Sequence, residues 1–167
     1  MKRFRGVALA VERRRMATAV RLDWRRILTQ GAAAGIIGGI LIDAFLYIAL
    51  FLPQHQPITA VWANVSATAT GHTVANPELG LLIHFCVSIA WGIGYAYASY
   101  TSAPIADHPY ISGVVFGIIV MLITQFVQLA AGVRLVITPI SLPSLLVAHC
   151  IFFGLPVAIY ISRVMRA

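Results

Sequence analysis

The stretch at residues 27–52 reads ILTQGAAAGIIGGILIDAFLYIALFL and contains one charged residue, Asp43. An apolar run of about 20 residues, when helical, matches the hydrocarbon thickness of a bilayer. Three similar stretches without any charged residue follow at 79–100, 110–132 and 144–161. The sequence therefore predicts an all-α fold, an integral membrane four-helix bundle whose transmembrane domain covers residues 27–163.

The composition supports this class and excludes others. The chain has 167 residues, of which 60% are apolar and only 10% charged, which excludes both a disordered protein and an ordinary water-soluble domain. Of the twelve Lys and Arg residues, nine lie at 1–26, and Arg163 and Arg166 follow the last span. By the positive-inside rule, this distribution places both termini, including the tail 164–167, in the cytoplasm. It indicates topology rather than a nucleic-acid partner.

The basic segment 1–26 precedes the first span. We expect it to lie on anionic headgroups at the cytoplasmic surface. A mitochondrial transit peptide is an alternative, and Met16 is an alternative start to Met1.

Glycines recur at intervals of four residues in two of the predicted spans. They are Gly31, Gly35 and Gly39 in the first span and Gly113 and Gly117 in the third. Small residues on one helix face let two backbones approach closely in lipid. We expect these faces to pack inside the bundle, or alternatively to bind a second copy of the chain or a larger membrane complex.

The first and third spans also correspond to each other. Gly31, Gly35 and Asp43 align with Gly113, Gly117 and Gln125 at a constant offset of 82 residues. The second and fourth spans open with similar sequences, LLIH at 81–84 and LLVAH at 145–149. A tandem repeat of a two-helix hairpin would explain both matches, with the repeats related by an axis along the membrane normal.

Each span carries a polar side chain that is costly in lipid, and these are Asp43, His84, Gln125 and His149. Counted from the outer ends of the helices, they lie roughly 10 to 15 Å deep. We therefore expect a polar cluster in the outer half of the bundle. It would serve either as a buried network or as a site that binds a ligand or handles protons, with Asp43 as the proton acceptor.

The two histidines suggest a cofactor. His84 and His149 could be the axial ligands of a b-type haem, with Arg134 pairing a propionate and with Gly92 and Gly94 leaving room. A zinc or copper ion fits less well, because no Cys, Asp or Glu clearly completes the ligand set. Since no catalytic motif is present, we expect the protein not to be an enzyme.

The external loop at 53–78 is longer than a tight connection requires. Its middle, Ile58–Val65, is expected to form a short interfacial helix that holds Trp62 at headgroup level.

The second span contains IHFCVSI at 83–89 followed by Gly94 and Tyr95, and it resembles the corresponding helix of the YagU-like family of bacterial inner-membrane proteins. The resemblance spans roughly residues 27 to 165 and includes the Gly113 and Gly117 pair, His149, and the ISR sequence at 161–163. It implies a small multi-pass protein of the bacterial inner (plasma) membrane, rather than a particular activity. Gln125 departs from a histidine expected at that position in the family, which weakens a three-histidine metal site.

Three functions are consistent with these features. The first is a non-enzymatic protein whose His/Asp/Gln cluster binds a ligand such as haem b. The second is an accessory or assembly subunit of a larger membrane complex. The third is a small proton-coupled exporter that uses Asp43. Such an exporter would resemble the small multidrug resistance family in having four spans with one carboxylate in the first, but the long loop and the histidines depart from that pattern.

Overall fold

The computed structural model describes residues 22–70, 76–131 and 142–166. Within these ranges the chain is helical and has no strand. Four helical segments in this described part of the chain are long and apolar enough to cross a membrane, at 24–54, 77–101, 109–130 and 142–165. The four predicted spans are thereby confirmed as helices of suitable length and composition. Residues 1–21, Gly132 and Arg134 lie outside the described ranges, together with the predictions that rest on them.

The first span is built from three consecutive helical segments. Helix α2 (Trp24–Leu46) passes into a π-helix, η1 (Tyr47–Phe51), and then into a 3-10 turn, η2 (Leu52–Gln54). The Asp23 side chain caps α2 by accepting a hydrogen bond from the Arg26 N–H at 3.0 Å. The span ends where His55 adopts a left-handed conformation with φ of 55°.

The remaining elements follow in chain order. They are α3 (Thr59–Thr70), α4 (Pro77–Thr101), α5 (Ala103–Asp107), α6 (Pro109–Ala130), α7 (Leu142–Val147), a π-helix η3 (Ala148–Gly154) and α8 (Leu155–Arg166). Asn76 caps α4 by accepting a hydrogen bond from the Leu79 N–H at 2.9 Å. The short helix α5 occupies the connection between α4 and α6. Helix α8 continues through Arg166, so most of the predicted tail is helical.

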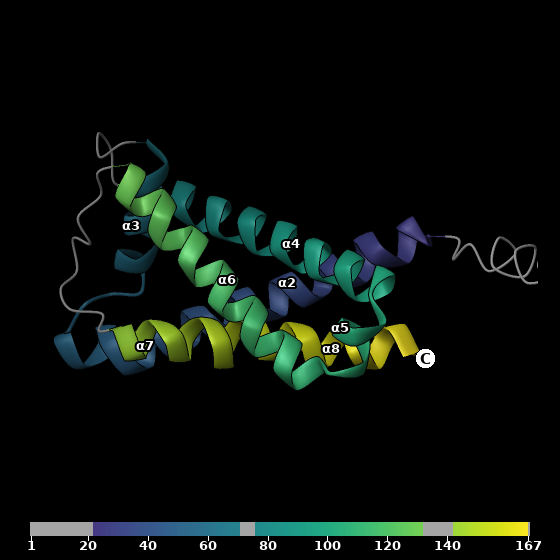
Figure 1. Ribbon diagram of the computed structural model, residues 1–167. Coiled ribbons are helices and arrows are strands. Elements are labelled where there is room, and N and C mark those ends of the chain that lie inside the picture. The colour runs from purple at the N-terminus through teal and green to yellow at the C-terminus, as the bar shows by residue number, and fades with distance from the viewer. Residues whose placement is uncertain (1–21, 71–75, 132–141, 167) are drawn as a thin grey trace, which may run out of the picture.

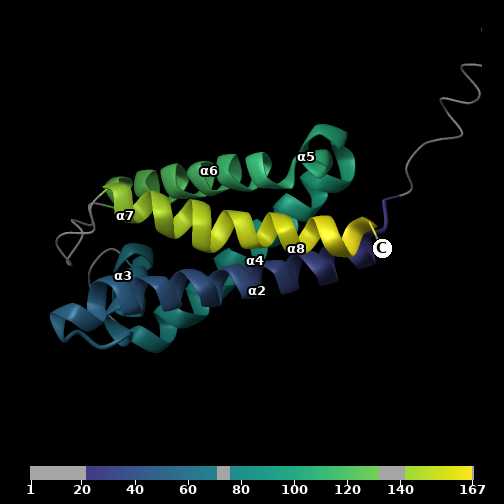
Figure 2. The ribbon, with the colours of Figure 1, turned by 90° about the horizontal axis from the view of Figure 1, so that it is seen from below.

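Figures 1 and 2 show α3 and α7 at one end of the bundle, with the start of α2, α5 and the end of α8 at the other. Two contacts fix this arrangement between the first and last spans. The Tyr160 hydroxyl donates to Gln30 Oε1 at 2.9 Å, and Arg26 Nη2 donates to the Val164 carbonyl. The start of the first span and the end of the last span therefore lie at the same end of the bundle.

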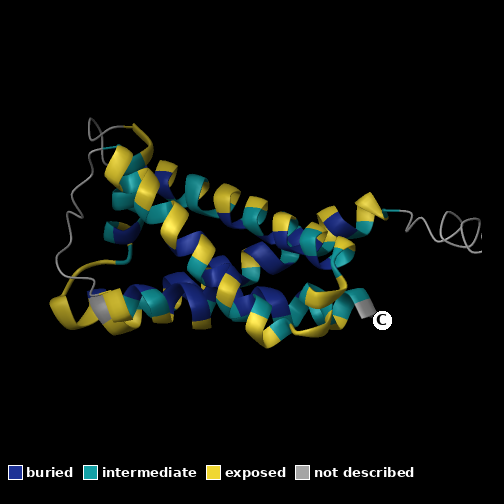
Figure 3. Ribbon diagram, in the orientation of Figure 1, coloured by how far each residue is buried: buried dark blue, intermediate teal, exposed yellow. Residues whose placement is uncertain are grey.

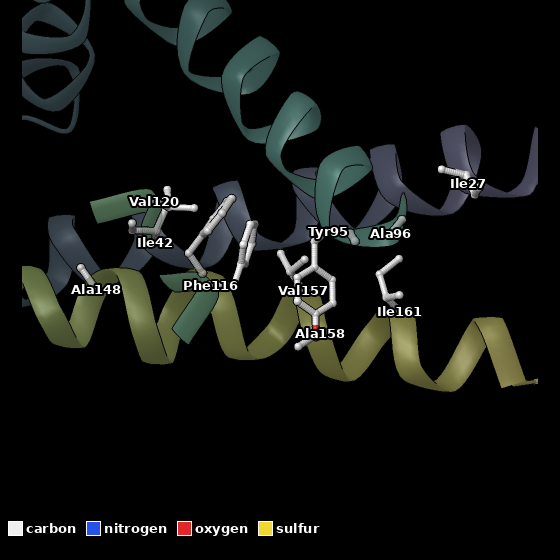
Figure 4. Close-up of a cluster of buried hydrophobic side chains, with 12 residues drawn as sticks. Ile27, Ile42, Tyr95, Ala96, Phe116, Val120, Ala148, Val157, Ala158 and Ile161 are labelled. Carbon is white, nitrogen blue, oxygen red and sulfur yellow. The ribbon is translucent and has the colours of Figure 1, made fainter. Parts of the chain in front are cut away.

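The buried positions face inward between the helices (Figure 3), and many large apolar side chains are exposed on the outward surface. Leu129 is 77% exposed, Phe126 70% and Ile111 68%. Soluble monomers seldom expose large side chains this densely, whereas lipid tails solvate them well. Inside the bundle, Phe116, Tyr95 and Val157 belong to a buried cluster formed by the spans (Figure 4).

Helices α2 and α4 cross at glycines. A Cβ added to Gly31 would lie 2.5 Å from Ile93 Cα, and one added to Gly35 would lie 2.7 Å from Ile89 Cα. From the α4 side, a Cβ on Gly92 would lie 2.5 Å from the Gly35 nitrogen. Because the opposing atoms belong to the backbone, only glycine permits this close approach.

Helix α6 crosses the last span in an equivalent way. A Cβ on Gly113 would lie 3.1 Å from Leu155 Cα, and one on Gly154 would lie 2.7 Å from the Gly117 nitrogen. Gly154 thus corresponds to Gly92. A second copy of the chain could not use these glycine faces without separating the bundle, because other helices of the same chain already fill them.

The π-helix η3 shifts this correspondence by one residue. Gly35 approaches Ser88, four residues before Gly92, whereas Gly117 approaches His149, five residues before Gly154. A π-helix inserts one residue into a helical turn. The crossings therefore pair His149 with Ser88, whereas the sequence alignment paired it with His84.

Candidate functional site

A cavity of about 510 Å³ lies at the end of the bundle near α3. Its walls come from α2, α3, α4, α6 and the last span. The four polar residues singled out in the sequence, Asp43, His84, Gln125 and His149, all line it. The structure therefore brings them to one cavity, although they come from four separate spans.

Asp43 is 5% exposed and lies near the end of α2. Its Oδ2 accepts a hydrogen bond from Trp62 Nε1 at 3.0 Å, and its Oδ1 lies 3.3 Å from His84 Nε2. The indole donor belongs to α3, so this bond ties α3 to the first span. The expected short helix is present as the longer α3, and the Trp62 N–H finds an acceptor inside the protein, while its level relative to the headgroups stays a prediction.

His84 lies on α4 and faces α2. Its Nε2 is 3.3 Å from the Gly39 carbonyl oxygen and the same distance from Asp43 Oδ1. Both oxygens are acceptors, so Nε2 carries the hydrogen. Gly39 leaves room for side chains of α4 here, since a Cβ on it would lie 3.1 Å from Ser88 Oγ and 3.3 Å from the Phe85 ring.

His149 lies within η3 and is 9% exposed. Its Nδ1 is 2.9 Å from the Leu145 carbonyl oxygen, which can only accept, so Nδ1 is the donor. In the neutral ring, Nε2 then keeps a free lone pair. Single π-turns are frequent at functional sites, and this one determines which residue faces the second crossing.

Gln125 and Gln128 lie one turn apart on α6 and both line the cavity. Gln125 Nε2 donates to Gln128 Oε1 at 3.3 Å. In the described part of the chain, the hydrogen bonds of the polar residues form separate local pairs. They do not form one closed network, so some polar groups at the cavity wall can still form hydrogen bonds with a ligand.

Two further cavity residues, Asn64 and Thr68, come from α3 and were not expected. Their spacing of four residues on one helix face could have indicated a face directed inward. Asn64 Oδ1 is buried, and no hydrogen-bond partner is found for it within the described residues. The same holds for Asp43 Oδ1, whose close neighbour His84 donates to Gly39 instead.

The geometry gives little support to a haem or metal centre. Among the described residues there is no group of three His, Cys, Asp or Glu side chains that could hold a metal ion. His84 Nε2, the usual axial atom, faces α2 rather than His149. The space beside Gly92 is filled by the α2 backbone, and Gly94 faces open space away from the cavity. An absorption spectrum of the purified protein tests haem b directly.

Searches against protein-family models, curated proteins and solved structures found no match to this chain. The resemblance to the YagU-like family therefore stays a prediction, and the cavity is interpreted from its own geometry.

Proposed function

We propose that this protein binds a small, mainly apolar ligand in the cavity near α3, without catalysing a reaction. The observation that carries the proposal is the buried Asp43 carboxylate at the wall of a cavity of about 510 Å³. Ionisable side chains are rare in membrane spans and mark ligand or ion sites when they face an internal cavity.

The size and lining of the cavity suit such a ligand. Binding pockets for small molecules are typically about 300 to 1,000 Å³, mostly apolar, with a few polar groups that fix orientation. Here Val61, Trp91 and Phe153 supply part of the apolar wall, and Asp43 and His149 supply polar groups. The packed cluster of Figure 4 runs from the cavity wall, at Ile42 and Val120, to Ile27 and Ile161 near the opposite end of the bundle, and would act as the rigid support.

We place the protein in the bacterial inner membrane with both termini cytoplasmic. The basic residues near the two termini support this orientation, as does the location of the described ends at one end of the bundle (Figure 2). The cavity would then lie toward the extracytoplasmic surface. The equivalent glycine crossings support the proposed hairpin duplication.

A proton-coupled exporter is a second candidate, because Asp43 and His84 form a close pair at the cavity wall. A ligand that displaced this contact could change the proton occupancy of the carboxylate. An accessory-subunit role would have to use the outer apolar surface, because the glycine faces are filled within the chain.

Saturable binding of a neutral dye such as Prodan to the protein in lipid nanodiscs would test the proposed function. Val65→Trp places a bulky ring at the cavity wall and should weaken binding by about tenfold or more. Val115→Trp is the matched control, because Val115 lies on the exposed face of α6 outside the cavity. Equal binding by both variants, or signal no greater than that of empty nanodiscs, would contradict the proposal.

A further inference from the structure

We infer that the ligand is a lipophilic amine, bound as its ammonium form with the N–H groups directed at Asp43. This inference rests on the proposed function, since it specifies the chemistry of the molecule that the cavity accepts. It follows from the hydrogen-bonding character of the buried polar groups and from the charges at the wall.

Three polar atoms at the cavity wall are acceptors that lack a donor in the described part of the chain. Asp43 Oδ1 and Asn64 Oδ1 are buried oxygens, and no hydrogen-bond partner is found for either within the described residues. His149 uses Nδ1 as a donor to Leu145, which leaves Nε2 as an acceptor in the neutral ring. A ligand that satisfies these atoms must bring hydrogen-bond donors.

Three donors beside these acceptors are already engaged, whereas the Ser88 and Thr124 hydroxyls, which can donate or accept, also line the cavity. Trp62 Nε1 donates to Asp43 Oδ2, and the Thr68 hydroxyl donates to the Asn64 backbone carbonyl. His84 Nε2 donates to the Gly39 carbonyl. The glutamines on α6 carry both donors and acceptors and are only half-buried, so they favour neither a donor nor an acceptor on the ligand.

The wall carries one acidic group, Asp43, whose Oδ1 lies 3.3 Å from His84 Nε2, a cation only when the imidazole is protonated. Asp43 is the one carboxylate among the cavity residues in the described chain, and neither Lys nor Arg lines the cavity there. An anion would therefore meet a carboxylate without a permanent cation to offset it. A buried acceptor that has no hydrogen-bond donor costs more free energy than a typical hydrogen bond contributes. A ligand without donors should therefore lose more binding free energy than one such bond would provide.

The apolar part of the wall indicates which tail the ligand carries. Trp91, Phe51 and Phe153 provide aromatic surface around the polar groups. An ammonium group near aromatic faces gains further attraction from their quadrupoles. A short aromatic or alkyl tail on an amine head therefore fits both parts of the cavity.

The experiment is displacement of Prodan from the wild-type protein in nanodiscs by four ligands with one shared tail. They are phenylbutylamine, phenylbutanol, the methyl ether of phenylbutanol, and phenylpentanoate. An alkylamine is protonated at about pH 7. The amine should displace the dye at a concentration about tenfold below that of the ether, with the alcohol between them and the carboxylate weakest. Corrections for partition into lipid come from empty nanodiscs.

Two variants test whether the preference for the amine arises at the cavity. Asp43→Asn should bring the amine to within about threefold of the alcohol, and Asn64→Asp should widen the advantage of the amine. Glu78→Gln is the control, because it removes an exposed carboxylate at the start of α4 and should leave the ranking unchanged.

The outcomes separate this inference from the proposed function. If Prodan binds and Val65→Trp weakens it, but the ether displaces it as well as the amine, the amine inference is overturned and ligand binding stands. The inference also fails if Asp43→Asn folds, binds Prodan and keeps the full amine advantage. If Prodan does not bind the wild-type protein, both proposals fall together.

Discussion

The glycine crossing between α2 and α4 makes a quantitative prediction about stability. Gly35→Ala adds a single Cβ that would lie 2.7 Å from Ile89 Cα and 2.8 Å from the Ser88 carbonyl carbon. Carbon atoms in contact are normally about 3.5 to 4.0 Å apart, so the helices must separate by roughly 1 Å at this point. Both opposing atoms belong to the backbone and cannot move aside as a side chain could.

Gly94→Ala is the matched control. Gly94 lies on the same helix as Gly92, but no atom lies within 4 Å of the position of its added Cβ. Both substitutions change the intrinsic helix preference equally, by about 1 kcal/mol in favour of alanine. The difference between them therefore isolates the overpacking cost, which is typically about 1 to 3 kcal/mol.

The assay is reversible unfolding in mixed micelles, followed by loss of helical signal as the fraction of denaturing detergent rises. We expect Gly35→Ala to be less stable than Gly94→Ala by about 2 kcal/mol. Gly117→Ala should behave like Gly35→Ala, because its Cβ would lie 2.6 Å from Cys150 Cα. Equal midpoints for Gly35→Ala and Gly94→Ala would refute the close crossing.

Three further predictions concern the polar cavity. Trp62→Phe removes the indole donor to a buried carboxylate and should lower stability by about 1.5 to 3 kcal/mol in the same assay, whereas an effect within error would show that the hydrogen bond is absent. Because His84 Nε2 faces α2, protein purified from haem-replete cells should show no Soret band. A band that disappears in His84→Ala or His149→Ala would instead establish haem ligation. If the protein is an exporter, substrate flux driven by a pH gradient should vanish in Asp43→Asn, and undiminished flux would remove that candidate.

The sequence was sufficient for the spans and for the polar residues of the cavity. A charge-free run of bilayer length has few alternatives to a spanning helix, so hydropathy alone placed all four. Asp43, His84, Gln125 and His149 could be assigned to one region because lipid penalises each of them, and the bundle interior is where such groups can find partners. That reasoning needed no knowledge of the contacts between helices.

The contacts themselves were not predictable in the same way. Hydropathy does not reveal the hydrogen bond from Trp62 to Asp43, because it depends on α3 folding back over the bundle. Gly92 and Gly154 do not show the four-residue spacing, since neither has another glycine four residues before or after it, so the sequence did not identify them as partners of the spaced glycines. The π-helix η3 adds one residue to a helical turn and so brings His149 to the position equivalent to Ser88. A comparison of residue types between the two segments does not reveal this change in the backbone.

The most direct test of the ligand-binding proposal is a titration of nitrogen-labelled protein with phenylbutylamine, observed at the indole N–H signals of its three tryptophans. Trp62 donates to Asp43 and Trp91 lines the cavity, whereas Trp24 stacks on Tyr97 at the opposite end of the bundle. A ligand in the cavity should shift the Trp62 and Trp91 signals in a saturable manner and leave Trp24 unchanged. Shifts of equal size at all three, or an unmoved Trp62 at saturation, would contradict binding at this site.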